Sequence, residues 1–212
     1  MTGRLVVESS ARPGVAGFGA YWELETRLRM AEAATGSVVG ATGAIYAIRR
    51  ELYEPVPPGT LLDDVLTPIR IALGGRRVYM AADAVAVDTP SKSERAEYRR
   101  RVRTLGGNIQ LLTLLPGVLW PFRGFGWRFL FHKLLRAMTP LLLIGLMVSG
   151  LVLEGPLYTA SAGVLVLLHL AGLVGLVVRH PILSIPASFL LFQAAGLEAV
   201  LRPRRTAQRL WT

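Results

Sequence analysis

Cysteine is absent from this chain of 212 residues, and lysine is nearly so, with Lys92 and Lys133 as the only two. The lack of cysteine excludes disulfides, thiol catalysis and cysteine-bound metals. Acidic residues are also few: 14 Asp and Glu stand against 24 Lys and Arg, which gives a net charge of +10. The N-terminal residues have no long apolar core, so they do not have the pattern of a signal peptide.

Apolar residues, in contrast, make up 52 % of the chain and crowd its C-terminal part. A mean hydropathy of +0.44 is high for a soluble globular protein. A basic chain can bind nucleic acid, an anionic membrane surface or phosphorylated substrates. Many arginines flank apolar segments, which favours the membrane. No recognisable nucleic-acid-binding motif occurs, so nucleic acid is not an expected partner, although the basic residues from Arg95 to Arg103 leave it as a minor alternative.

The stretch from Gly40 to Asp64 has the composition of a functional site. It begins with the small residues Gly40, Ala41, Thr42 and Gly43, continues through an apolar segment and a proline-rich turn, and ends in the pair Asp63-Asp64. Glycine and alanine let a ligand approach the backbone closely. Carboxylates where a loop enters a helix are well held yet open to a cleft, which suits a general base acting on a hydroxyl. The alternative is that Asp63 only caps the helix.

Predicted strands and helices alternate over residues 1–118, which indicates an α/β layer. Strands are expected over residues 5–8, 38–49 (one or two strands), 76–80 and 84–87. Helices are expected over residues 21–34 and from Asp63 to the pair Gly74-Gly75. The first of these helices carries its apolar positions at Trp22, Leu24, Leu28 and Met30.

A further helix is predicted over residues 91–115, where Ser91 and Glu94 have the spacing of a capping box. One face of this helix carries Arg100, Arg103, Gly107 and Gln110. A solvated basic helix is the simplest interpretation. The pair Gly106-Gly107 argues against it, because a glycine inside a helix costs about 1 kcal/mol and is tolerated more readily where something packs close.

Residues 119–136 mix aromatic rings with cations ahead of an apolar run, which is typical of a helix in the membrane interface. The membrane region, 137–212, follows. Residues 137–153 and 160–178 each approach the length of a membrane span, roughly 17–25 residues. The connector 154–159 has no Lys or Arg, so the positive-inside rule places it outside and both flanks in the cytoplasm.

The apolar segment 181–200 is either a re-entrant segment or a third span, and it precedes a basic tail, 201–212. A third span would carry the basic tail to the outer face, so we favour a re-entrant or interfacial segment. Within the second span, His169 is expected to form an interhelical hydrogen bond rather than to bind a ligand.

Three segments together resemble the C-terminal half of a membrane-bound family 2 glycosyltransferase, of the group that includes cellulose synthase-like and hyaluronan synthase-like enzymes. They are Gly40 to Arg50, Asp63-Asp64, and Arg100-Arg101-Val102-Arg103-Thr104. The resemblance implies a partial GT-A catalytic domain, then an interfacial helix and transmembrane helices, in a bacterial-type cytoplasmic membrane. It also implies inverting transfer, on the cytoplasmic side, from a nucleotide-sugar donor to a polysaccharide or lipid-linked acceptor.

The resemblance assigns roles to individual residues. Asp64 matches the general base on the acceptor hydroxyl, and Asp63 matches the acidic position before it. Residues 40–43 match a loop near the acceptor. The family's donor pyrophosphate meets side chains that correspond to Arg100, Arg101 and Arg103. Three positions depart from the family pattern: Leu62 stands in place of a threonine, Arg100 in place of a glutamine and Thr104 in place of a tryptophan. The loss of the tryptophan leaves open whether transfer is processive or a single addition.

The family's first half carries an Asp-x-Asp motif that holds Mg²⁺ or Mn²⁺ on the donor diphosphate. No Asp precedes Gly40 in this sequence, so the metal ligands of the complete enzyme are absent from this chain. We therefore expect the chain to begin in mid-domain and to be inactive alone, as a fragment or with a separate chain that supplies the other half. The competing interpretation is a non-catalytic membrane anchor or assembly subunit.

Overall fold

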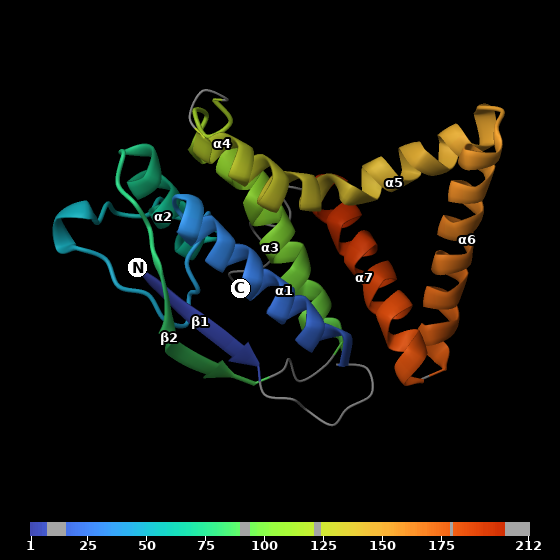
Figure 1. Cartoon of the computed structure of the whole chain (residues 1–212), viewed down its shortest axis with the longest axis horizontal. Coiled ribbons are helices and arrows are strands. Elements are labelled where there is room, and N and C mark those ends of the chain that lie inside the picture. Colours follow the sequence, from blue (N-terminus) through green and yellow to red (C-terminus); the bar gives the residue numbers. More distant parts are fainter. Residues whose placement is uncertain (8–15, 90–93, 121–123, 179, 202–212) are drawn as a thin grey trace.

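The structure is a computed structural model that describes residues 1–7, 16–89, 94–120, 124–178 and 180–201. These residues are mostly helical, so the predicted α/β layer is reduced to a two-stranded sheet beside helices, and a long helical extension leads away from it (Figure 1). In chain order the elements are β1 (Thr2–Val7), α1 (Ala16–Thr35), α2 (Asp63–Leu73), β2 (Met80–Asp88), α3 (Glu94–Leu114), α4 (Gly124–Phe129), α5 (Leu135–Val152), α6 (Pro156–Val177) and α7 (Pro181–Leu201).

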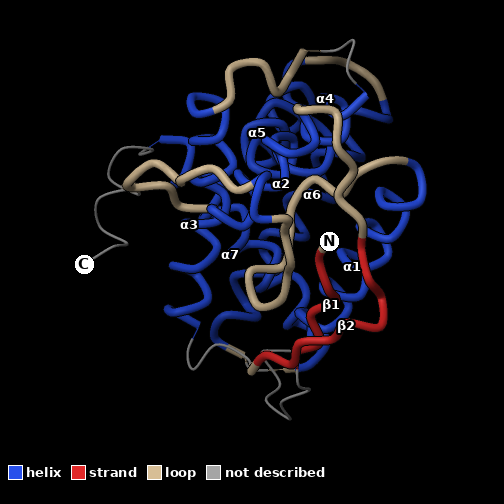
Figure 2. Tube along the Cα trace, turned by 90° about the vertical axis from the view of Figure 1, so that its left-hand side faces the viewer, coloured by secondary structure: helices blue, strands red, loops and turns tan. Residues whose placement is uncertain are grey.

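The two strands are parallel and pair with Arg4 opposite Val85 and Val7 opposite Asp88. Figure 2 shows them at one end of the molecule. The strand expected over 84–87 lies within β2, whereas the strand expected over 76–80 does not form, because only Met80 belongs to β2. The first predicted strand overlaps β1. The prediction for helix 91–115 is confirmed by α3, although Ser91 of the expected capping box lies outside the described residues.

The strands predicted over 38–49 do not form. This segment makes single backbone bonds to several different elements instead of one ladder: the N–H of Val38 donates to Val78, that of Ala41 to Asp64 and that of Ala47 to Met1. It then turns through a short 3₁₀ helix at Arg50–Leu52. Because these bonds go to the residue before β1, to the segment ahead of β2 and to α2, residues 38–49 join these parts of the fold together.

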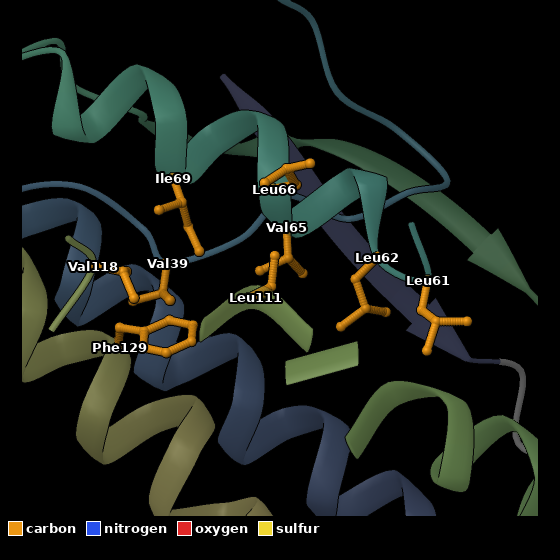
Figure 3. Packing of buried hydrophobic residues seen from close by; sticks show 9 residues of the cluster. All are labelled: Val39, Leu61, Leu62, Val65, Leu66, Ile69, Leu111, Val118 and Phe129. Atoms are coloured by element: carbon orange, nitrogen blue, oxygen red, sulfur yellow. The ribbon is translucent and has the colours of Figure 1, made fainter. Parts of the chain in front are cut away.

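One apolar cluster unites the loop, α2, α3 and α4 (Figure 3). Its members are Val39, Leu61, Leu62, Val65, Leu66, Ile69, Leu111, Val118 and Phe129. The ring of Phe129 is fully buried, although α4 begins the helical run that leads to the apolar helices. Burying a side chain of this size contributes on the order of 1.5–3 kcal/mol, so this cluster fixes α4 against the layer that holds Asp63 and Asp64.

The helical run is continuous from Gly124 to Val152, with one π-helical stretch at Leu130–Leu134 between α4 and α5. The predicted interfacial helix and first span are therefore parts of one helix, although residues 121–123 lie outside the described residues. Within the described part of the chain, three helices are long and apolar enough to cross a membrane: Gly124–Val152, Pro156–Val177 and Pro181–Leu201. The last is unbroken despite Pro186, so it has no re-entrant turn, although whether it crosses stays a prediction.

Two expectations about individual helices are wrong. In α1 the apolar side chains of Leu24 and Met30 are 67 % and 47 % exposed, whereas Glu25 and Glu32 are buried. In α6 the Nδ1 of His169 lies 2.7 Å from the carbonyl oxygen of Leu165 in the same helix, so its hydrogen bond is not interhelical. The contact of His169 between helices is an edge-on packing against the ring of Phe189 in α7.

Candidate active site

Asp63 and Asp64 are the first two residues of α2, and the helix ends at the predicted Gly74-Gly75 pair, where Gly75 has a φ of +80°. The N-cap residue is Leu62, which makes no side-chain capping bond. Asp63 is therefore inside the helix, and the interpretation of this residue as a cap is not supported. Asp63 is exposed and Asp64 is half-buried, so the two adjacent carboxylates have different surroundings.

Helix α3 holds the start of α2 in place. The backbone N–H of Leu61 donates to Oε1 of Gln110 at 2.9 Å, and Nε2 of Gln110 donates to the carbonyl of Gly59 at 2.9 Å. A Cβ at Gly107 would stand 2.5 Å from Cγ of Leu62. The close neighbour that the glycine pair in α3 indicated is therefore the segment leading to Asp63.

The loop of residues 40–43 lies against the first turn of α2. The N–H of Ala41 donates to the carbonyl of Asp64 at 2.8 Å, and a Cβ at Gly43 would stand 3.0 Å from Oδ2 of Asp64. Ala41 and Thr42 are buried, whereas Gly43 is exposed. The small residues thus allow the first turn of α2 to pack closely against the loop. Their contact with an acceptor stays a prediction, and Gly43 fits it best because it is exposed.

Burial raises the pKa of the Asp64 carboxyl, and the negative charge of Asp63 raises it further. The positive charges of Lys133, Arg29 and Arg103 act in the opposite direction, but they do not cancel the effect. A carboxylate with a raised pKa is a stronger base, and the best general base has a pKa near the working pH. Asp64 therefore has the environment that proton abstraction from a hydroxyl requires.

The three predicted donor-binding arginines point to different surroundings. The positive charge of Arg103 acts on Asp64. A guanidinium nitrogen of Arg100 lies 3.8 Å from the carboxylate of Asp88, at the end of β2. Arg101 pairs with Glu97 at 3.0 Å in its own helix. Its guanidinium also lies 5.2 Å from the centre of the Phe192 ring in α7. The charge of Arg103 thus acts on the Asp64 carboxyl, whereas the side chain of Arg101 is turned toward α7.

Two kinds of residue at this site were missed by the sequence reasoning. Burial raises the pKa of the Tyr46 hydroxyl, and the charges of Asp63 and Asp64 raise it further, so Tyr46 belongs to the acidic site. Its position just after the small-residue loop was a usable signal. The cations Arg29 and Lys133 come from α1 and the π-helical stretch, and no local pattern links them to Asp64.

The described residues contain no group of three or more Asp, Glu or His side chains placed to hold a metal ion. Asp63 and Asp64 are a pair without a third such ligand. The residues present therefore do not fit the divalent metal that the family resemblance implies, and no step of the proposed reaction passes through one.

A half-buried carboxylate whose pKa is raised by burial is a candidate functional site, and here it belongs to a chain with helices long enough to span a bilayer. Residues 19–178 match the family model described as "Glycosyl transferase family group 2", and the chain belongs to this family. The predicted resemblance to family 2 is thus confirmed, without a subgroup. No curated protein and no solved structure matches the chain.

Proposed function

We propose that this chain is the acceptor-side and membrane part of an inverting glycosyltransferase, of the cellulose synthase-like and hyaluronan synthase-like group. It serves transfer of a sugar from a nucleotide-sugar donor to a polysaccharide or lipid-linked acceptor at the cytoplasmic face of a bacterial-type membrane. The observation that carries the proposal is Asp64: a half-buried carboxylate with a raised pKa, against Gly43, in a chain of this family.

In this reaction Asp64 accepts the proton of an acceptor hydroxyl while the oxygen forms a bond to the anomeric carbon. The bond from that carbon to the diphosphate breaks on the opposite face, so the configuration inverts and a nucleoside diphosphate leaves. The positive charge of Arg103 acts on Asp64. Arg100, three residues earlier in the same helix, lies 3.8 Å from Asp88 at the end of β2. Guanidinium groups suit phosphate oxygens, which supports a role for these two in stabilising the leaving group.

The donor-binding half of the reaction, including its metal, is supplied by protein outside these 212 residues, either in the same polypeptide or in a second chain. The support is that the described residues do not form a metal-binding group. The isolated chain then turns over negligibly.

The packing of the apolar helices supports two membrane crossings, by α5 and α6. Ala137 at the start of α5 packs with Ala195 and Ala199 near the end of α7. The hydroxyl of Tyr98 in α3 donates to Glu198 at 2.8 Å. Three successive crossings would put the start of α5 and the end of α7 on opposite faces of the bilayer. On this reading α6 brings the chain back to the catalytic side and α7 stays there without crossing, and the connector between α5 and α6 lies outside.

The test is Asp64→Asn, with transfer measured in membranes that contain the donor-binding half, at equal expression and over a panel of nucleotide-sugars. Loss of the base lowers the rate by about 10²–10⁴-fold. Asp83→Asn is the matched control, because Asp83 is exposed on β2, and it retains wild-type transfer. Near-wild-type transfer by Asp64→Asn overturns the assignment and favours the second candidate, a non-catalytic membrane anchor, for which Phe129 and the apolar helices provide the attachment.

A further inference from the structure

A cluster of buried and half-buried charges lies between α1 and the helix that leads to the apolar region. Its members are Glu25, Arg29 and Glu32 of α1, His132 and Lys133 of the π-helical stretch, and Arg136 of α5. Glu25 is at its centre. Oε1 of Glu25 lies 3.0 Å from Nε of Arg29, and Oε2 lies 3.0 Å from Nη1 of Arg136. Buried charges are costly to desolvate and persist where partners satisfy them.

His132 closes this cluster. Its Nδ1 lies 2.7 Å from Oε1 of Glu32, and its Nε2 lies 3.0 Å from Oε1 of Glu25. Each ring nitrogen of His132 therefore has a carboxylate partner, and the ring joins Glu25 to Glu32 across the buried face of α1. The other carboxylate oxygen of Glu32 accepts from the N–H of Val39, just ahead of the small-residue loop, at 3.2 Å. The Glu32 carboxylate is therefore held by His132 on one side and by the backbone of Val39 on the other.

Arg29 connects the cluster to the candidate active site. While its Nε contacts Glu25, its Nη1 donates to Oγ1 of Thr42 at 2.9 Å. Thr42 is held from the other side, because its N–H donates to Oγ1 of Thr2 at 2.8 Å and its own hydroxyl donates to the carbonyl of Gly3 at 3.2 Å. The next residue is Gly43, which lies against Asp64. A guanidinium is a rigid fork, so it fixes the distance between its two partners.

The same guanidinium acts on Asp64 through its charge. The charges that act on the pKa of the Asp64 carboxyl are those of Asp63 on its own helix and of three cations from three other elements, Arg29, Lys133 and Arg103. The charge of Asp64 in turn acts on the hydroxyl of Tyr46 on the loop. Of these cations Arg29 is also hydrogen-bonded to the loop beside Asp64. Lys133 is bound to Glu25 at 3.7 Å, and Arg103 is exposed.

We propose that Arg29 is a positioning residue for the transfer reaction: anchored by Glu25, it holds the loop of residues 40–43 against Asp64 and keeps its positive charge on the loop side of that carboxyl group. The role rests on the proposed function, because it matters for transfer if Asp64 is the base. The influence of Arg29 on the protonation of Asp64 can, however, be measured without any transfer activity.

The first test measures that protonation directly. The chain has four aspartates, Asp63, Asp64, Asp83 and Asp88, so carboxyl-¹³C aspartate labelling in detergent gives four signals that Asp64→Asn assigns. In Arg29→Met the midpoint of Asp64 moves to higher pH than in the wild type, whereas Arg29→Lys, which keeps the charge, stays near the wild type. The matched control is Arg27→Met, because Arg27 is exposed on the same helix and pairs with Glu23, and it leaves the midpoint unchanged.

Thr42→Val separates position from charge, because it removes the hydroxyl that Arg29 binds and keeps the side-chain shape. Misplacing a base costs up to about 100-fold in rate, so transfer falls while the Asp64 midpoint stays near the wild type. Equal Asp64 midpoints in Arg29→Met and Arg27→Met overturn the proposal, as does wild-type transfer by Thr42→Val.

If Arg29→Met does not fold, an Asp64 midpoint displaced upward in Arg29→Lys contradicts the charge role. The two proposals can fail separately. If the wild-type chain transfers no sugar with the donor-binding half present, the proposed function is refuted. A higher Asp64 midpoint in Arg29→Met than in the wild type would still establish the influence of Arg29.

Discussion

Gly43 lies so close to Asp64 that a methyl group on its Cα would stand 3.0 Å from the carboxylate Oδ2. The loop and the carboxylate therefore fit together only with a hydrogen at this position, unless one of them shifts. Because Gly43 does not need a left-handed backbone, the requirement for glycine at this position is one of space.

We expect Gly43→Ala to displace Asp64 or the loop by a few tenths of an ångström. Transfer should fall by up to about 10-fold, since a full 1 Å misplacement at a reacting group costs about 100-fold. The thermal stability of the chain should change little, because Gly43 is exposed. The measurement is the transfer rate at saturating donor. Gly117→Ala is the control, since a Cβ at Gly117 has nothing within 4 Å. Equal rates for the two variants would show that the contact has no part in catalysis.

A second prediction concerns Asp63, whose negative charge helps to raise the pKa of Asp64. In Asp63→Asn that charge is removed, so the pKa of Asp64 falls and its carboxylate persists to lower pH. The acidic limb of kcat/KM should then move to lower pH, opposite in direction to the shift expected for Arg29→Met. A pH–rate profile measures both variants against the wild type. A limb that moves in the same direction in both would exclude Asp64 as the titrating base.

The sequence predicted correctly that Asp63 and Asp64 open a helix, because the signals for this are local. Prolines and a glycine precede Asp63-Asp64, a glycine pair ends the helix, and the structure has α2 between these limits. It also indicated a close approach at residues 40–43 and at Gly106-Gly107. What it could not supply was the partner, since Gly43 meets Asp64 and Gly107 meets Leu62, and these pairings depend on tertiary packing.

The wrong predictions have a common cause, which is bonding between distant parts of the chain. Residues 38–49 have a strand-like composition, yet their backbone groups bond to Met1, Asp64 and Val78 separately. In α1 the hydrophobic pattern suggested that Leu24 and Met30 face the core. The buried residues are instead Glu25 and Glu32, which have their partner His132 about 100 positions later in the sequence. Burial of charge becomes predictable only when the compensating charges are known.

The buried cluster also predicts how the protein responds to acid. Burial alone would raise the pKa of Glu25, but the hydrogen bond from His132 and the charges of Lys133, Arg29 and Arg136 outweigh it and hold that pKa well below its usual range. A carboxylate whose pKa is lower in the folded state stabilises the fold fully above its unfolded pKa, and this contribution is lost as the pH falls. The apparent melting temperature in detergent should therefore drop as the pH is lowered below about 4.5, the ordinary value for glutamate.

Glu25→Gln should be less stable at neutral pH by roughly 3–5 kcal/mol, the usual cost of breaking a buried ion pair, and its stability should depend less on acid. Glu23→Gln, an exposed change on the same helix, should keep the wild-type profile, whereas parallel pH profiles for Glu25→Gln and the wild type would contradict the prediction.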